Sequence, residues 1–585
     1  MRDHSKKCRL FSRRALVLSC IKLLGFSLLS GRFFYLQIKQ NKKFRTLSDN
    51  NRIKLQILPP IRGNIIDSLG DAVAINSSSY RVELNPMFID VAEAVVEKIG
   101  AILDCKTSIS QIGVQNAIKK SLVHKIPIII QNHLSFKDIV KIEVCLDLIG
   151  KVEIVKVQHR LYKAGKLWGH IIGYVSKPSL QEVKTASIPN YREFEIGKNG
   201  VEKYFEVQLQ GTPTIRKTEV DVLGRFVREL NLSYGIPGQN LQLSVDSTIQ
   251  SKICDIMGDL KGAVILLNPL NGQVVSSHSS PTYDPNKFVG GINSQDWREL
   301  LNNPDKPLIN KVISTPYPPG STFKLVTALA ILRSGIDPQE KILCTGEYKL
   351  GNHTFHCWNK YGHGYMNFQN AIASSCNVYF YIQGLRAGIN KIADTARLLG
   401  LGDKTGIELP FENQGIVPNH SWKVDKFKQS WHAGDTINAT IGQGYLLVTP
   451  IQLATMVARI VTGKCISPTL LTQISNTAEI SDLENINPMH LQMIKQGMYM
   501  VFNSPIGTGY INRVTVPGRE LAGKSGTAQV ISQRQFVEIQ NKEHGLFVGF
   551  WPYDQPQYVM SIVIEHGGWG SRSTVPIAKQ LIESL

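Results

Sequence analysis

Three short motifs in the second half of this chain constrain its fold more than any other feature. They are Ser321-Thr-Phe-Lys324, Ser375-Cys-Asn377 and Lys524-Ser-Gly-Thr527. Each pattern also occurs elsewhere, at Ser19–Lys22, Ser48–Asn50 and Lys404–Gly406, so one match alone means little. The last of these soon meets Pro410, which would end a strand, and we interpret it as a turn. The first three follow one another in order, and their flanking sequences fit one shared cleft.

The first motif places a nucleophile and a base at the start of a predicted helix. Two prolines and a glycine precede Ser321, and the apolar run Leu325–Leu332 is long enough for a buried helix. A helix N-terminus offers free N–H groups where an acyl oxyanion would form. The Lys324 amine lies on the same helix face and can take the serine proton if burial or a neighbouring cation lowers its pKa. An isolated motif of this kind would more simply be a helix cap followed by a surface lysine.

The second motif, Ser375–Asn377, falls between two helical stretches, residues 368–374 and 378–385. A hydroxyl on a loop at this place can face the cleft. We expect Ser375 to relay a proton to a leaving amine and the Asn377 amide to orient a substrate peptide.

The third motif, Lys524–Thr527, leads into a predicted strand. Its glycine, Gly526, lets another backbone approach and add as an extra strand. We expect Lys524 to be the cation beside the base. The hydroxyls of Ser525 and Thr527 suit a substrate carboxylate, and the Thr527 N–H suits the oxyanion.

This set of motifs resembles the penicillin-binding protein transpeptidases, which acylate a serine with a D-alanyl peptide or a β-lactam. The likeness covers nearly the whole chain and is closest to the class B enzymes of the penicillin-binding protein 2 type, the D,D-transpeptidases of cell elongation. Further stretches that carry it are Arg62–Asp67, His170–Val175, Gly200–Glu206, Gly434–Ile437 and Ile441–Tyr445. The resemblance implies a serine-type D-Ala-D-Ala transpeptidase/carboxypeptidase that acts on peptidoglycan stem peptides and is inhibited by β-lactams. The catalytic residues it implies are Ser321, Lys324, Ser375, Asn377 and Lys524, with Ser525, Gly526 and Thr527 binding substrate.

Resemblance and pattern together predict an α+β protein in four parts. These are a cytoplasmic tail (1–14), a transmembrane helix (15–36), an elongated α+β pedestal or dimerisation-like domain (37–235) and a transpeptidase domain (240–585). The relatives imply a five-stranded antiparallel sheet between helical layers in the last domain. The stretches Leu241–Asp246 and Ala263–Pro269 open this domain, Leu546–Phe550 and Tyr558–Ile564 are predicted as buried strands, and a closing helix is predicted over 576–585.

The composition fits an anchored protein that works outside the cytoplasm. With 585 residues there is room for two or three domains. The net charge of +19 comes from Lys and Arg spread through the chain, without a basic motif interleaved with aromatic residues, so nucleic acid is not an expected partner. A basic surface facing anionic lipid and cell-wall polymer explains the charge better.

One stretch near the N-terminus, Ala15–Leu36, has about the length that a bilayer needs. Lys22 and Arg32 interrupt it, and Lys22 must snorkel or face a protein partner. Basic residues flank both ends, so the charges do not give the orientation. The resemblance implies a single-pass anchor in the cell inner membrane with a periplasmic catalytic domain. A cleaved signal peptide is the alternative, but no A-x-A-like site follows the apolar run.

The chain has nine cysteines, an odd number that cannot all form disulfides within one chain in an oxidising compartment. Four residues near the second motif, Cys344, Cys357, His363 and Cys376, carry metal-ligand side chains, although their spacing is not a zinc-finger pattern. The resemblance implies one structural Zn²⁺ on these four, because relatives of the penicillin-binding protein 2 type bind zinc at the matching positions. A disulfide such as Cys344–Cys357 is the alternative, and His356 could replace a ligand. Zinc here would clamp two loops and would not activate water.

Other functions fit the sequence less well. A septal class B transpeptidase is the nearest alternative, and the Cys/His cluster favours the elongation enzyme. A serine β-lactamase shares the three motifs, but no E-x-x-L-N follows Ser375–Asn377 and a lactamase needs no anchored pedestal. The complete catalytic set argues against an inactive β-lactam sensor. The first half has no E-D-x-x-F-like polymerase motif, and the resemblance implies a RodA-type glycan polymerase and the elongation scaffold as partners.

Overall fold

The computed structural model describes residues 2–42, 52–103, 111–124, 127–149, 152–179, 181–182, 194–221, 226–472, 480–528 and 543–585. The chain forms two compact units. The anchor unit comprises Met1–Ile61 and Gly211–Gly238, and the catalytic unit comprises Arg62–Gln210 and Gln239–Leu585.

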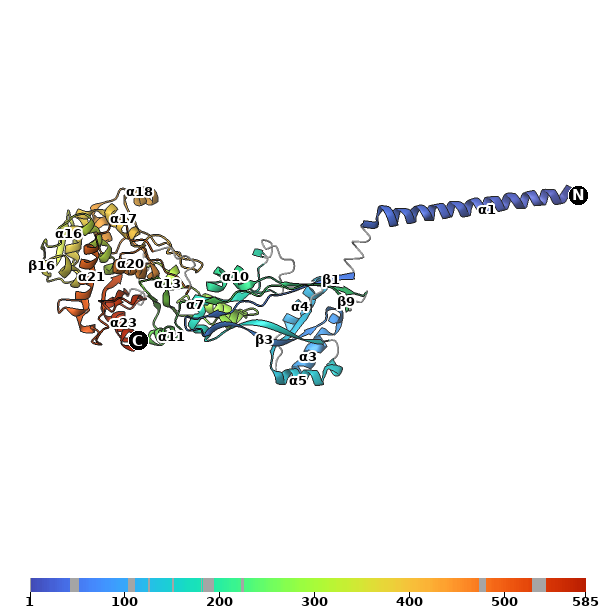
Figure 1. The fold of residues 1–585 in the computed structure, drawn as a ribbon, viewed down its shortest axis with the longest axis horizontal. Coiled ribbons are helices and arrows are strands. Elements are labelled where there is room, and N and C mark those ends of the chain that lie inside the picture. The colour runs from blue at the N-terminus through green and yellow to red at the C-terminus, as the bar shows by residue number, and fades with distance from the viewer. Residues whose placement is uncertain are drawn as a thin grey trace. The chain divides into compact units, whose positions relative to one another are not determined.

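The anchor unit begins with a long apolar helix. Helix α1 (Arg2–Phe34) continues into the π-helical turn η1 (Tyr35–Lys39) (Figure 1). In the described part of the chain, Arg13–Lys39 is the one helix long and apolar enough to cross a membrane. The predicted membrane segment therefore lies inside a longer helix. The same unit holds an antiparallel sheet in the order β1-β8-β9, made of β1 (Ile53–Leu58), β8 (Thr214–Val220) and β9 (Phe226–Ser233).

The pedestal predicted over residues 37–235 is divided: part of it belongs to the anchor unit, and most of it forms the first part of the catalytic unit, Arg62–Gln210, an α+β region. Its long antiparallel strands are β3 (Ala72–Leu84), β4 (Ile128–Leu134) and β5 (Val152–Tyr162). Its helices include α3 (Ala92–Ile102), α4 (Gln111–His124), α5 (Phe136–Val144), α6 (Leu146–Ile149), α7 (Gly165–Ile172), α9 (Gly200–Tyr204) and α10 (Glu206–Gln210). A separate small core under β3 and β4 holds this part together.

The stretch Leu241–Asp246, predicted to open the catalytic domain, lies outside the catalytic sheet. Its first two residues form β10 (Leu241–Gln242), which pairs in parallel with β2 (Ile65–Ile66) of the pedestal. The strand cannot run on to residue 246 because Asp246 is the N-cap of α11 (Ser247–Met257), where its side chain accepts the N–H groups of residues 248 and 249.

A buried ion cluster joins two of the stretches that carry the family resemblance. Arg62 Nε lies 2.6 Å from Glu202 Oε2, and Arg160 Nε lies 2.7 Å from Glu202 Oε1. Arg62 also reaches Glu206 at 2.6 Å, and the Tyr162 hydroxyl donates to Glu202 at 3.3 Å. Burial alone would raise the pKa of Glu202, but the two guanidinium groups outweigh it and hold that pKa below its usual range.

We expect Glu202→Gln to destabilise the pedestal strongly, because it leaves Arg62 and Arg160 buried with too little negative charge. Breaking a buried pair by removing one partner typically costs about 3–5 kcal/mol. Urea unfolding of the purified protein measures the change. Glu340→Gln is the matched control, because Glu340 and its partner Arg386 are well exposed, and it should leave stability nearly unchanged. Equal effects of the two substitutions would contradict the prediction.

The transpeptidase domain is built on the five-stranded antiparallel sheet that was predicted. The strand order is β12-β11-β19-β18-β17. The strands are β11 (Gly262–Leu267), β12 (Val274–Ser280), β17 (Ala522–Ala528), β18 (His544–Trp551) and β19 (Tyr558–Ile564). Their residues are nearly all buried because helices cover both faces, with α11 and α23 (Val575–Ser584) on one face and α14 (Lys324–Arg333) and α20 (Pro450–Thr462) on the other. β17 is an edge strand.

Further helices surround this sheet (Figure 1). They are α12 (Ser294–Asn302), α13 (Lys311–Ser314), α15 (Phe368–Ala373), α16 (Asn377–Ala387), α17 (Ile389–Leu398), α18 (His420–Phe427), α19 (Ala433–Thr440), α21 (Pro488–Asn503) and α22 (Gly570–Ser573). Two hairpins lie beside α16: β13 (Ile342–Cys344) pairs with β16 (Gly364–Met366), and β14 (Glu347–Leu350) pairs with β15 (His353–His356).

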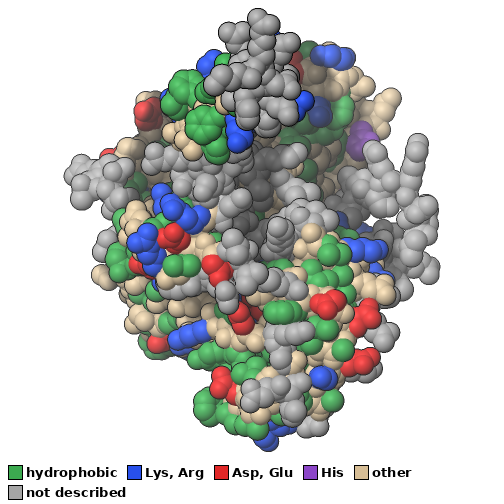
Figure 2. Space-filling model, turned by 90° about the vertical axis from the view of Figure 1, so that its right-hand side faces the viewer, with side chains coloured by type: hydrophobic (Ala, Val, Ile, Leu, Met, Phe, Trp, Pro, Cys, Tyr) green, Lys and Arg blue, Asp and Glu red, His purple; other side chains and the backbone are tan. Residues whose placement is uncertain are grey.

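Charged side chains are mixed on the surface. On the face drawn in Figure 2, Lys and Arg side chains lie in several separate groups, with Asp, Glu and apolar side chains between them. On this face the pattern agrees with a chain whose Lys and Arg residues are spread over its length.

Candidate active site

Ser321 lies in a tight turn directly before helix α14. The turn, Gly320–Phe323, is a 3₁₀ helix that continues directly into α14, so Ser321 lies at the start of the helix as predicted. Gly320 has φ +52°, and a Cβ there would lie 2.5 Å from the carbonyl oxygen of Thr527. Only glycine permits this contact, which brings the nucleophile's turn against strand β17.

The three motifs meet at the hydroxyl of Ser375. Lys324 Nζ lies 3.2 Å from Ser375 Oγ, 2.8 Å from the Ser375 carbonyl oxygen and 2.6 Å from Asn377 Oδ1. Lys524 Nζ donates to the same Ser375 Oγ at 2.9 Å. Among the described residues, no hydrogen bond engages the Ser321 hydroxyl. Lys324 therefore contacts the second motif and makes no hydrogen bond to the Ser321 hydroxyl.

Both lysines of the site are fully buried, and their charges compete. Burial lowers the pKa of Lys324 to about 8, although the nearby thiols of the Cys/His cluster oppose the shift. Burial and the charge of Lys324 hold the pKa of Lys524 well below its usual value. Because the two amines share one hydroxyl, protonation of one disfavours protonation of the other. This arrangement provides a neutral amine near neutral pH.

Strand β17 supplies the opposite wall of the site. Lys524, Ser525 and Gly526 are buried in it, and Thr527 is partly exposed. A Cβ at Gly526 would lie 3.1 Å from the carbonyl oxygen of Pro319, so the strand and the nucleophile's turn are in close contact. Within the described residues, β17 pairs with β18 alone. Its free edge can accept an extended peptide as an added strand.

Residues from a neighbouring segment hold the Ser375 loop in a strained backbone conformation. Ser375 has φ +54°, in the left-handed region that non-glycine residues rarely adopt. The Trp358 indole N–H donates to the carbonyl oxygen of Ser374 at 3.1 Å, and Asn377 Nδ2 donates to the carbonyl oxygen of His356 at 3.2 Å. Trp358 and the His356 carbonyl were not predicted to position this loop. Nothing local in the sequence signals these contacts.

The four predicted ligand residues come together beside this loop. The ligand atoms of Cys344, Cys357, His363 and Cys376 all lie within 4.8 Å of one another. His363 Nδ1 is 3.5 Å from the sulfur atoms of both Cys344 and Cys357. All three cysteines are free and buried, and the exposed His356 side chain is not part of the group. A hydrogen bond from Cys376 holds the pKa of the Cys357 thiol well below its usual value, which favours a thiolate.

These distances fit a tetrahedral metal site. Four ligands at about 2.3 Å from a zinc ion would lie about 3.8 Å from one another, inside the observed spread. A Cys₃His set without a carboxylate or an open position is typical of closed structural zinc. The structure therefore places suitable donors at suitable separations.

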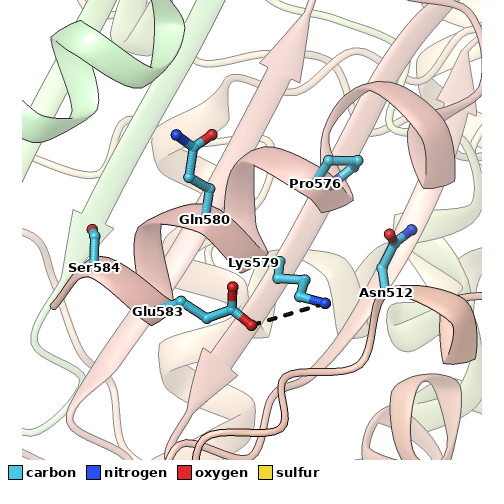
Figure 3. A pocket seen from close by; sticks show the side chains of 6 residues that line it. All are labelled: Asn512, Pro576, Lys579, Gln580, Glu583 and Ser584. Carbon is cyan, nitrogen blue, oxygen red and sulfur yellow. Dashed lines mark ion pairs between the residues drawn. The ribbon is translucent and has the colours of Figure 1, made fainter.

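A pocket elsewhere in the domain is not part of this site. It has a volume of about 370 Å³ and is lined by Asn512, Pro576, Lys579, Gln580, Glu583 and Ser584. Figure 3 shows Asn512 on the short turn Tyr510–Asn512 and the other side chains on helix α23, with Lys579 paired to Glu583 at 3.8 Å. None of the motif residues lines it.

A turn-borne serine, a buried lysine base, a bridging serine and an open edge strand define a serine acyl-transfer enzyme. Residues 262–583 match the model of the penicillin-binding protein transpeptidase domain, and residues 57–243 match that of the penicillin-binding protein dimerisation domain. The chain belongs to the class B penicillin-binding proteins.

Relatives of known name resemble the chain over its full length. It is 33% identical to the peptidoglycan D,D-transpeptidase MrdA of Salmonella typhimurium strain LT2, over 100% of this chain and 97% of that protein. The MrdA of Escherichia coli K12 is 30% identical over 97% of this chain and 93% of that protein. Among solved structures, penicillin-binding protein 2 of Helicobacter pylori in complex with MreC has a TM-score of 0.82 and 32% identity, covering 91% of this chain and 99% of that one.

Acylation of Ser321 is expected to become faster as the pH rises through about 8, the lowered pKa of Lys324. Only the neutral amine can accept the serine proton, so below that pH the rate should rise roughly tenfold per pH unit and then level off. Stopped-flow measurement of the acylation rate constant with a β-lactam, over a pH range in which circular dichroism shows no unfolding, checks this. A flat profile through pH 8 would exclude Lys324 as the base.

Proposed function

We propose that this chain cross-links peptidoglycan stem peptides during cell-wall elongation, as a D,D-transpeptidase that forms an acyl-enzyme on Ser321. The observation that carries the proposal is the meeting of Lys324 and Lys524 at the Ser375 hydroxyl, beside the turn that bears Ser321. The names of the MrdA relatives support the same reaction and the role in elongation.

The proposed reaction has two acyl transfers. Neutral Lys324 takes the hydroxyl proton of Ser321, and the serine oxygen attacks the carbonyl carbon of the penultimate D-alanine. The N–H groups of Ser321 and Thr527 stabilise the oxyanion, and Ser375 relays the proton to the departing D-alanine amine as the C–N bond breaks. Asn377 orients the donor peptide. An acceptor amine then attacks the ester, forms the new amide and returns the proton to Ser321; water in its place would give carboxypeptidase activity.

A direct assay with two soluble peptides tests this function. A donor ending in D-Ala-D-Ala and an acceptor with a free side-chain amine should give free D-alanine and one cross-linked product. Ser321→Ala should give neither. If the protein instead opened β-lactams and released them within seconds, it would be a lactamase and not a transpeptidase.

The location and partners of the protein are part of the proposal. The single N-terminal apolar helix supports a single-pass anchor in the inner membrane with the catalytic unit in the periplasm. A structure of a relative, 26% identical with a TM-score of 0.72, is described as a peptidoglycan synthase complex that coordinates polymerization and crosslinking. Together with the MreC complex of the H. pylori relative, it supports a RodA-type glycan polymerase and the elongation scaffold as partners. A mature N-terminus between Ser30 and Gln40 would exclude the anchor.

We also propose that Cys344, Cys357, His363 and Cys376 hold one structural zinc ion. The close approach of four soft donors and the low pKa of Cys357 support this. When bound, the ion would cross-link the β13/β16 hairpin to the start of α16. The residues of that hairpin and of the following loop would then keep Ser375 and Asn377 in place through the contacts of Trp358 and the His356 carbonyl.

A further inference from the structure

Three large aromatic side chains pack on one another at the surface of the transpeptidase domain. Trp422 and Phe427 belong to helix α18, and Tyr445 belongs to the segment after α19. The ring centroids lie 5.3 Å apart for Trp422 and Tyr445, 5.2 Å for Phe427 and Tyr445, and 5.6 Å for Trp422 and Phe427. None of the three belongs to a buried core cluster, and 44% of Phe427 is exposed. We call Trp422, Phe427 and Tyr445 the aromatic platform.

The platform rests on a rigid base. Lys423 of the same helix is buried and forms an ion pair with Asp435 of α19 at 2.5 Å. Its ammonium group lies 5.8 Å from the ring centroids of both Tyr445 and Trp431. Asp435 also accepts the backbone N–H of His432 at the start of α19. These contacts fasten α18 to α19, so the exposed ring of Phe427 and the partly exposed rings of Trp422 and Tyr445 keep a defined orientation.

The platform adjoins the nucleophile's turn. Gly320 donates its N–H to the carbonyl oxygen of Gly442 at 2.9 Å. A Cβ at Gly442 would overlap the Gly320 carbonyl oxygen, so the two backbones are in close contact. Tyr445 follows Gly442 by three residues, which limits their separation to about 11 Å. Tyr445 and the rings packed on it therefore lie close to the turn that carries Ser321.

A second contact path links the platform to the Asn377 loop. A Cβ at Gly434, beside Asp435 in α19, would lie 3.7 Å from Phe355 Cζ in β15. The neighbouring His356 carbonyl accepts the Asn377 amide. The base of the platform thus borders the loop that faces the substrate as well as the turn that carries the nucleophile.

We propose that the aromatic platform binds a sugar ring of the glycan strand that carries the donor stem peptide. The inference rests on the proposed function. A stem peptide of about five residues spans at most about 17 Å, so the sugar at its far end lies within reach of rings this close to Ser321. The C–H face of a pyranose ring is apolar and flat, and it suits an exposed aromatic surface that the protein core does not use.

The test compares substrates with and without sugars. In Phe427→Ala and in Trp422→Ala, cross-linking of glycan strands that carry stem peptides should fall about five- to tenfold, as expected for the loss of one stacked ring. Labelling by fluorescent penicillin and transfer of a sugar-free pentapeptide should stay within about twofold of wild type, because these ligands do not reach the platform. Glycan strands stripped of peptide should quench tryptophan fluorescence in the wild type and much less in Trp422→Ala.

Trp297→Ala is the matched control, since Trp297 is an exposed tryptophan on α12 in the same domain. It should change none of the readouts. Equal losses with sugar-linked and sugar-free donors would show that the rings only support the fold, and this would overturn the proposal. Unchanged glycan cross-linking in both platform variants would overturn it too. Phe427→Ala covers the case in which Trp422→Ala fails to fold, because Phe427 is the most exposed ring. A wild type that penicillin does not label would defeat the proposed function itself, and the platform proposal with it.

Discussion

Ser321→Ala is expected to abolish covalent labelling by penicillin while the protein stays folded. Removing the nucleophile of a serine acyl-transfer enzyme typically costs about 10⁶-fold in rate. The fold should not suffer, because the Ser321 hydroxyl makes no hydrogen bond among the described residues and its turn is held by Gly320 against β17 and Gly442. Intact-protein mass spectrometry after β-lactam treatment measures the adduct. A mutant that still gained the adduct mass would place the nucleophile elsewhere.

The lysines provide a companion test with an internal control. Lys324→Ala should slow acylation by about 10²–10⁴-fold, the usual contribution of a general base. Lys524→Ala should also impair it, because the Ser375 hydroxyl would lose one of its two amine partners. Lys404→Ala alters the competing K-T-G sequence, whose lysine is exposed in an irregular segment, and should label like the wild type. If Lys404→Ala and Lys524→Ala slowed acylation equally, the assignment of Lys524–Thr527 as the third motif would lose its support.

Loss of the proposed zinc ion is expected to weaken both stability and acylation. Purified protein should contain about one zinc per chain. Cys357→Ser should lower the zinc content and the melting temperature, by about 5–10 °C if the change costs a few kcal/mol. Acylation should fall as a consequence, because the Cys357 sulfur also accepts the Asn377 N–H at 3.4 Å and its loop holds Ser375 in place. Metal analysis, thermal unfolding and penicillin labelling on the same preparations measure the three effects.

Cys465→Ser is the control for the zinc experiment. Cys465 is a free, partly exposed cysteine outside the Cys/His cluster, so its replacement should leave metal content and labelling unchanged. A metal-free wild type with full acylation would defeat the zinc proposal. A mapped disulfide joining any two of Cys344, Cys357 and Cys376 would defeat it as well. The serine and lysine assignments would survive either result.

Much of the transpeptidase domain could be predicted from local sequence. The apolar run after Lys324 is a helix, and the two apolar stretches near the C-terminus are strands β18 and β19. Lys404–Gly406 is not part of a strand, as its proline neighbour indicated, and lies in an irregular segment in which the N–H groups of Thr405 and Gly406 donate to Glu412. Such features depend on residue type and spacing within a few residues, so they can be predicted from the sequence alone.

Only the tertiary structure decided how the motifs act on one another. The left-handed backbone of Ser375, the shared hydroxyl between Lys324 and Lys524 and the Trp358 contact all depend on segments far apart in the chain. The pairing of β10 with the pedestal sheet is of the same kind. Contacts of this sort depend on how helices and strands pack, and side-chain periodicity along one element carries no record of its partner. The sequence by itself therefore determined which groups this protein uses for chemistry, while packing determined their positions, charges and strain.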